Sequence, residues 1–137
     1  MDKCSAKNLL IENGLKLTSQ RELLLDTIIN SDSIFSAISL QEKVNASMDL
    51  VTIYRILTVF LNKNIIREVI TNDNTCFYEL SCEHHPVHPH FFCKKCKSIT
   101  CLDPVNAHTI VTTGDYSSDY IIEDIAIQLM GVCPKCK

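Results

Sequence analysis

The sequence predicts an α+β protein made of two small parts. Three observations support this: a series of helical patterns in the first half, two β-prone runs that follow it, and two Cys-x-x-Cys pairs near the C-terminal end. With 137 residues, 46% of them hydrophobic, the chain can bury a core. Two halves of about 80 and 55 residues would each be marginally stable without a staple or a dimer interface.

Four helices are expected in the first half. Their predicted ranges are 7–13, about 19–30, a short helix opened near Ser39, and 49–62. Gly14 can end the first helix in the left-handed conformation, and Ser39 with Glu42 forms a capping box for the third. Asp49 would cap the fourth helix, whose outer face is small and polar with one arginine.

Two β-prone runs, 65–71 and 75–80, are joined by Asn72-Asp73-Asn74 and predict a hairpin. Helices followed by a hairpin, within about 80 residues, are the order of a winged helix-turn-helix. That interpretation places helix 49–62 in the major groove of DNA, where an outward arginine can reach guanine or phosphate. A helical core with a hairpin lid is the alternative.

Charge gives little support to nucleic-acid binding. The chain has 13 Lys and Arg against 16 Asp and Glu, and residues 1–80 hold 8 basic and 10 acidic side chains. The DNA interpretation must therefore rest on local pattern. The first residues lack a secretory signal and no apolar run reaches the roughly 18 residues of a membrane span, so we expect a cytoplasmic protein without membrane contact.

The composition changes abruptly at 81–90, a polar segment with four histidines and two prolines. We therefore expect a first domain at 1–80, a hinge at 81–90 and a second domain at 91–137. In the second domain the patterns predict a strand at 98–102, a helix opened by Asp103-Pro104 and ended by Gly114, and a strand at about 121–130.

The two cysteine pairs predict a zinc site. Cys93 and Cys96, like Cys133 and Cys136, stand one tight turn apart, so that all four thiolates can reach one tetrahedral ion. The 36 residues between the pairs must then form a small domain that the metal closes. Structural zinc contributes roughly 10–16 kcal/mol in small zinc-dependent peptides. Redox-active pairs or an iron site are the alternatives.

The histidine segment predicts a second metal site. His88 and His90 lie two apart and point to the same side of an extended segment, and Cys82 adds a soft thiolate six residues earlier. A solvated histidine-rich loop is the alternative.

Several motifs resemble those of the ferric uptake regulator family of bacterial metal-dependent repressors, over about residues 12–136. The matching segments are Gly14-Leu-Lys-Leu-Thr18, Thr52-Ile-Tyr-Arg55, His88-Pro-His90 with Cys93-Lys-Lys-Cys96, and Gly131-Val-Cys-Pro-Lys-Cys136. The resemblance implies a winged-helix DNA reader joined by a hinge to a C-terminal α/β dimerisation domain, which holds a structural zinc at the four cysteines. Metal at the hinge would lock the two DNA readers of a homodimer at the spacing of a palindromic operator on double-stranded DNA.

The resemblance also implies DNA contacts. Tyr54 and Arg55 would contact bases and backbone in the major groove, and Lys16 the minor groove or a phosphate. Thr52 is a further candidate.

At the regulatory site the chain departs from the iron and peroxide sensors, whose hinge site draws a histidine from a position that corresponds here to the region of Ile34. Glu68, Cys82, His88 and His90 instead look like the site of the zinc uptake regulator branch. Cys101 stands where relatives often carry a carboxylate ligand, so it is the alternative to Glu68 as the fourth ligand. The resemblance therefore implies a zinc-responsive repressor of zinc-uptake genes, with two Zn²⁺ per subunit, no catalytic activity and no small-molecule substrate.

Three other functions are alternatives to this interpretation. An iron or peroxide sensor of the same family is the nearest. A zinc-dependent hydrolase would use His88, His90 and Cys82 around the metal, with Glu83 as the only nearby general base and no nucleophile motif beside it. A zinc-ribbon interaction module would bind no DNA.

Overall fold

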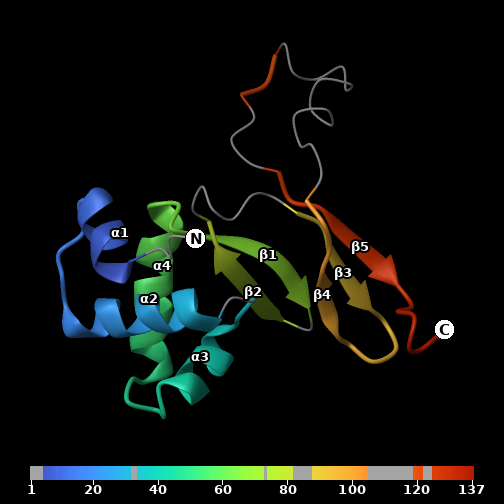
Figure 1. Cartoon of the computed structure of the whole chain (residues 1–137), viewed down its shortest axis with the longest axis horizontal. Helices are drawn as coiled ribbons and strands as arrows, with labels where there is room; N and C mark the ends of the chain where they lie inside the picture. Colours follow the sequence, from blue (N-terminus) through green and yellow to red (C-terminus); the bar gives the residue numbers. More distant parts are fainter. Residues whose placement is uncertain (1–4, 32–33, 73, 82–87, 105–118, 122–124) are drawn as a thin grey trace. The chain divides into compact units, whose positions relative to one another are not determined.

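The computed structural model describes residues 5–31, 34–72, 74–81, 88–104, 119–121 and 125–137. The chain divides into two compact units, Met1–His85 and Pro86–Lys137. The first unit contains helices α1 to α4 and strands β1 and β2, and the second contains strands β3 to β5 (Figure 1). The α+β class predicted from the sequence is confirmed. The helix expected after Asp103-Pro104 lies outside the described residues.

The chain begins with α1 (Ala6–Glu12) and α2 (Ser19–Ser31). Gly14 ends the first helix as predicted, with a φ of +69° that a residue with a Cβ atom rarely adopts. The hydroxyl of Thr18 accepts a hydrogen bond from the backbone N–H of Arg21 at 3.2 Å and so satisfies one of the free donors at the start of α2.

Helix α3 (Ala37–Lys43) begins earlier than the sequence predicted. Its N-cap is Ser36, whose hydroxyl accepts from the N–H of Ser39 at 3.1 Å, while the Ser39 hydroxyl accepts from the N–H of Ser36 at 2.9 Å. Ser39 therefore occupies the third helical position, and the box predicted between Ser39 and Glu42 is wrong. The two serines are the same distance apart as that predicted pair, so local spacing alone could not choose between them.

Helix α4 (Leu50–Asn62) follows α3 after a tight turn in which Asn45 and Ala46 have positive φ angles of 54° and 55°. Asp49 caps the helix as predicted, accepting from the N–H of Thr52 at 2.8 Å. The face of α4 that packs inward carries four buried apolar side chains: Ile53, Ile56, Leu57 and Phe60. The α3–turn–α4 arrangement is a helix-turn-helix.

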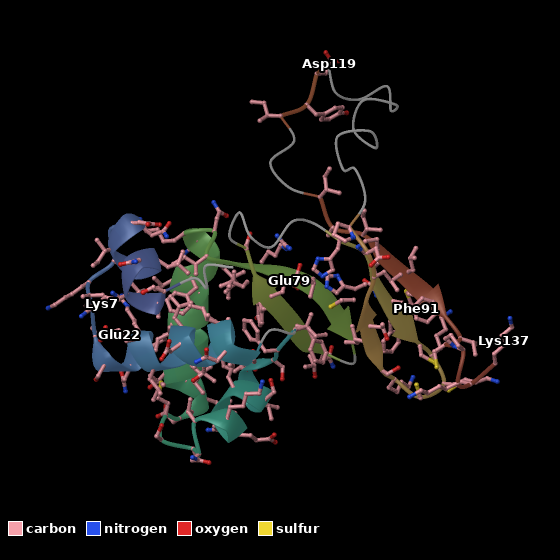
Figure 2. The ribbon with its side chains drawn as sticks, in the orientation of Figure 1. Lys7, Glu22, Glu79, Phe91, Asp119 and Lys137 are labelled. Atoms are coloured by element: carbon pink, nitrogen blue, oxygen red, sulfur yellow. The ribbon has the colours of Figure 1, made fainter. Side chains whose placement is uncertain are left out.

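Strands β1 (Ile66–Asn72) and β2 (Thr75–Leu80) form an antiparallel hairpin. Asn74 in the connection has a φ of 64°, as a tight hairpin turn requires. Arg67 on β1 donates from Nε to Oε1 of Glu79 on β2 at 2.6 Å, and this ion pair is largely shielded from solvent. Glu79 is labelled on the hairpin in Figure 2. The predicted hairpin is therefore present.

Phe35, just before α3, joins the hairpin through its backbone. It exchanges hydrogen bonds of 2.9 and 2.8 Å with Tyr78 on β2, which gives the helix-turn-helix its wing. Eighteen buried hydrophobic residues from the four helices, their connections and the hairpin form the core of this unit. Among the described residues, no helix combines the length and hydropathy that crossing a membrane would require.

The second unit contains a three-stranded sheet in the order β4-β3-β5. Strand β3 (His90–Cys93) runs antiparallel to β4 (Ile99–Cys101) and parallel to β5 (Gln128–Gly131). The strand at 98–102 was predicted, β3 was not, and the strand predicted at 121–130 is observed only at its C-terminal end within the described residues.

Candidate metal sites and nucleic-acid interface

The sheet of the second unit brings the two cysteine pairs together. Cys93 is the last residue of β3 and lies opposite Gly131 of the parallel strand β5, so both strands end at the same edge of the sheet. Each strand is followed by its Cys-x-x-Cys turn. All four Sγ atoms consequently lie within 4.8 Å of one another, and the cluster predicted from the sequence is confirmed.

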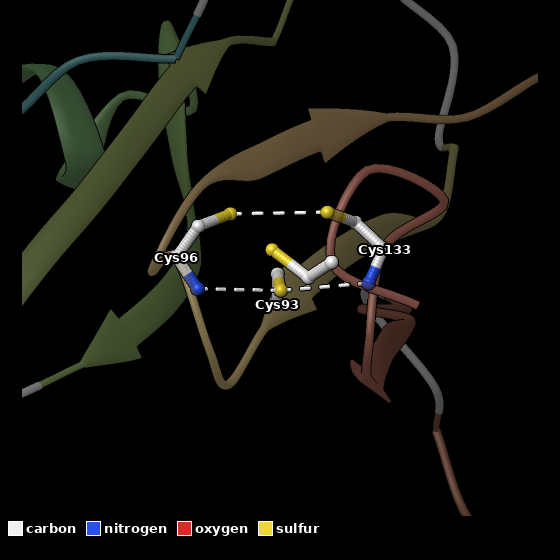
Figure 3. Close-up of side chains that lie close together, drawn as sticks. Cys93, Cys96 and Cys133 are labelled. Atoms are coloured by element: carbon white, nitrogen blue, oxygen red, sulfur yellow. Dashed lines mark hydrogen bonds between the residues drawn. The ribbon is translucent and has the colours of Figure 1, made fainter.

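The distances within this cluster fit zinc. The Sγ atoms of Cys96 and Cys133 are 3.8 Å apart (Figure 3). Four thiolates at about 2.3 Å from a tetrahedral Zn²⁺ would be separated by about 3.8 Å, whereas a disulfide requires about 2.05 Å. Cys93, Cys96, Cys133 and Cys136 are free cysteines. They form a set that can hold one tetrahedral zinc ion.

Backbone donors favour the thiolate form at the centre of the cluster. The N–H groups of Cys96 and Cys133 point at Sγ of Cys93 from 3.5 and 3.4 Å, and these hydrogen bonds lower the pKa of Cys93 to about 6. The hydroxyl of Ser98, 3.0 Å from Sγ of Cys96, lowers the pKa of that thiol as well. Hydrogen bonds with Cys133 and Cys96 raise the pKa of Cys136 to about 12. The role of Ser98 was not predicted from the sequence, although its place two residues after Cys96 is visible there.

A second group of potential ligands lies at the other end of β3. His90 stands directly opposite Cys101 in the antiparallel register of β3 and β4. The rings of His88 and His90 have centroids 4.5 Å apart, and one ligand atom from each histidine lies within 4.8 Å of Sγ of Cys101. His90 is buried, with 2% exposure, whereas Cys101 is exposed. Two imidazoles and a thiolate can thus converge on one ion.

The structure of the second unit does not test the other two predicted ligands of this site. Cys82 lies outside the described residues. Glu68 belongs to the first unit, where it is an exposed residue of β1 opposite Tyr78 of β2. Cys101, which the sequence offered only as an alternative, is therefore the residue that the geometry of the second unit associates with His88 and His90.

The predicted DNA contacts lie on and near the helix-turn-helix. Tyr54, 50% exposed, and Arg55 face outward from α4, and Thr52 is half-buried in its first turn. Lys16 is exposed in the connection between α1 and α2, where its carbonyl accepts from Nη1 of Arg21 at 2.9 Å. These positions leave the tyrosine ring and the guanidinium available to a ligand on the outer face of α4.

Comparison with known proteins agrees with this architecture. Residues 12–128 match the ferric uptake regulator family. The chain belongs to this family. It is 30% identical to the ferric uptake regulation protein of Campylobacter upsaliensis, across 95% of this chain and 85% of that protein. It is also 23% identical to the peroxide-responsive repressor PerR of Staphylococcus epidermidis, across 90% of this chain and 83% of that protein.

A solved structure shares the fold. The Helicobacter pylori ferric uptake regulator Fur, described as having three functional metal binding sites, superimposes with a TM-score of 0.75 at 18% identity, over 99% of this chain and 97% of that one. As a ferric uptake regulator family protein, the chain is a metal-responsive transcriptional regulator with a winged-helix DNA-binding fold. Members of this family regulate transcription and are not enzymes.

Proposed function

We propose that this family member is a zinc-responsive repressor, in which Zn²⁺ acts as the corepressor and zinc-uptake genes are the targets. The observation that supports zinc is the thiol of Cys101 beside the imidazoles of His88 and His90. It is a cytoplasmic homodimer that binds a palindromic operator on double-stranded DNA.

The ligand types favour zinc over the alternatives. A thiolate and two imidazoles are soft and borderline donors and suit a four-coordinate Zn²⁺. Ferrous and manganous ions prefer more ligands and more oxygen among them. Cys82 supplies a further thiolate, which together with Cys101 makes a two-sulfur, two-nitrogen set. Glu68 is the alternative to Cys101 and would add one carboxylate oxygen in its place.

Two Zn²⁺ per subunit then have different roles. The ion at Cys93, Cys96, Cys133 and Cys136 is structural and stays bound. The ion at the regulatory site binds more tightly to the arrangement of the dimer that fits the operator, and it shifts the equilibrium toward that arrangement. Tyr54, Arg55 and Thr52 on α4 contact the major groove, and Lys16 contacts the minor groove or a phosphate.

An iron- or peroxide-responsive regulator is the second candidate. The names of the similar Campylobacter and Staphylococcus proteins favour it, since one is a ferric uptake regulation protein and the other a peroxide-responsive repressor. The two candidates differ in which metal permits DNA binding. They also differ at the regulatory site, because the zinc candidate requires a cysteine thiolate among the ligands for metal-dependent DNA binding.

Metal-dependent DNA binding tests the proposal. A duplex selected from a randomised library would be titrated by fluorescence anisotropy with protein loaded with Zn²⁺, Mn²⁺ or, without oxygen, Fe²⁺. We expect Zn²⁺ to support binding at the lowest free concentration. We also expect Cys101→Ser and Cys82→Ser to lose this response, and Cys76→Ser, on β2, to keep it. Binding that requires Fe²⁺ or Mn²⁺, with Zn²⁺ inactive, would refute the zinc assignment.

A further inference from the structure

Helix α4 exposes an apolar side chain that its packing does not explain. Val51, the second residue of the helix, is 58% exposed and lies away from the buried stripe. A β-branched residue is also a poorer helix former than alanine, so an exposed valine here stabilises neither the core nor the helix. Its exposure was not predicted from the sequence, although its place outside the inward-facing pattern is visible there.

Val51 shares a face with the predicted DNA contacts. Residues three and four apart on a helix are neighbours, so Val51 adjoins both Tyr54 and Arg55 on the outer side of α4. Side chains of a helix point toward its N-terminus, and in a helix-turn-helix the first residues of the second helix contact base edges. Val51 is therefore at the end of α4 that would enter the major groove first.

The start of α4 is a poor anchor for a phosphate. The carboxylate of Asp49 already accepts from the N–H of Thr52 at 2.8 Å. The Thr52 hydrogen bonds lower the pKa of Asp49, so it is ionised at neutral pH. A negative charge at this end repels the sugar–phosphate backbone, whereas the exposed side chain of Val51 beside it carries no charge.

We propose that Val51 reads the C5-methyl group of a thymine in each half of the operator. The inference rests on the proposed function, because it requires α4 to lie in the major groove. In that groove the thymine methyl is the apolar feature that distinguishes the four base pairs, and apolar side chains recognise it by contact. Val51 and Arg55 are about 6 Å apart along the helix axis, so the thymine lies within about two base-pair steps of the base contacted by Arg55.

The test removes the contacting methyl groups from the thymine and from Val51 in turn. A palindromic duplex would first be selected from a random library by the full-length protein, loaded with whichever of Zn²⁺, Fe²⁺ or Mn²⁺ supports binding. Each symmetric pair of thymines would then be replaced by deoxyuridine, which lacks only the C5-methyl. Affinities of the wild type, Val51→Ala and Val51→Thr would be measured for every duplex. Ile11→Ala, which shortens a 57% exposed side chain on α1, is the matched control.

We expect one thymine pair at which deoxyuridine weakens wild-type binding about fourfold per half-site, which corresponds to about 0.8 kcal/mol for one methyl-sized group. Val51→Ala should abolish this difference at that pair only, Val51→Thr should reduce it, and Ile11→Ala should leave it unchanged. Equal sensitivity of the wild type and Val51→Ala at every thymine overturns the inference while leaving the regulator function intact. Failure of the wild type to select any duplex overturns both.

Discussion

Loss of the metal at the four cysteines should unfold the second unit and leave the first one folded. Among its described residues, the first unit has a core of eighteen buried hydrophobic side chains. In the described part of the second unit only Phe92, Cys93 and Cys133 are buried hydrophobic residues. Cys93 and Cys133 are also proposed zinc ligands, so loss of the metal also disrupts the buried core of this unit.

The expected free energy of unfolding of the second unit can be estimated from its size and compared with that of zinc binding. Domains are stable by about 0.05–0.15 kcal/mol per residue, which for the 52 residues of Pro86–Lys137 gives about 3–8 kcal/mol. Zinc binding contributes about 10–16 kcal/mol in small structural zinc peptides. The contribution of the metal exceeds the whole expected stability, so the metal-free unit should be unfolded under native conditions.

Amide NMR spectra provide the assay. Cys96→Ser, or removal of zinc by a strong chelator, should collapse the dispersed signals of β3, β4 and β5 while those of α1 to α4 remain, and zinc should restore them in the chelated wild type. Cys76→Ser, on β2, serves as the control and should retain both the zinc and the spectrum. Dispersed signals from β3 in the chelated protein would refute the reasoning, because the sheet would then be stable by itself.

Three further outcomes are expected from single substitutions. Cys101→Asp should shift the metal preference toward Fe²⁺ and Mn²⁺, because a hard carboxylate replaces a thiolate. The Co²⁺-loaded variant should also lose sulfur-to-metal absorbance relative to the Co²⁺-loaded wild type. Unchanged absorbance would exclude Cys101 as a ligand. Arg55→Ala should weaken operator binding by about 1–3 kcal/mol per contact if the arginine reads a base, with little effect from Lys7→Ala on α1. Affinity that Arg55→Ala leaves unchanged would remove α4 from the interface. Burial raises the pKa of Tyr78 to about 12, so the folded state favours its neutral form. The first unit should therefore lose stability as the pH rises from about 10 to about 12. Urea titrations should show a smaller loss for Tyr78→Phe.

The features that the sequence predicted well depend on neighbours in the chain. Asp49 caps α4 because its carboxylate meets an N–H three residues away, and both facts are local. The spacing of Cys93 and Cys96 likewise suits a single ion whatever the rest of the fold. Where local information was ambiguous, as between Ser36 and Ser39 as the cap of α3, the prediction failed by three residues.

The features that were missed depend on pairing between distant segments. Strand β3 has only four residues, too few for a periodic signal, and it exists because β4 and β5 bond to its two sides. Without β3, nothing in the sequence could show that Cys101 stands opposite His90. The predicted set therefore gave Glu68 precedence over a thiol that the register of the sheet places beside the histidines.

Strand β3 also connects the two candidate metal sites. It carries His90 at one end and Cys93 at the other, about 10 Å apart along the strand. Zinc at the four cysteines would hold the β3–β4 turn and the end of β5, and these are the contacts that keep His90 opposite Cys101. Regulatory binding should therefore require the structural ion, so that Cys96→Ser loses both equivalents of zinc whereas Cys101→Ser loses one. The dependence is reciprocal, because a second zinc that binds only the folded unit stabilises it by mass action, by about 2.7 kcal/mol at a hundredfold excess over its dissociation constant.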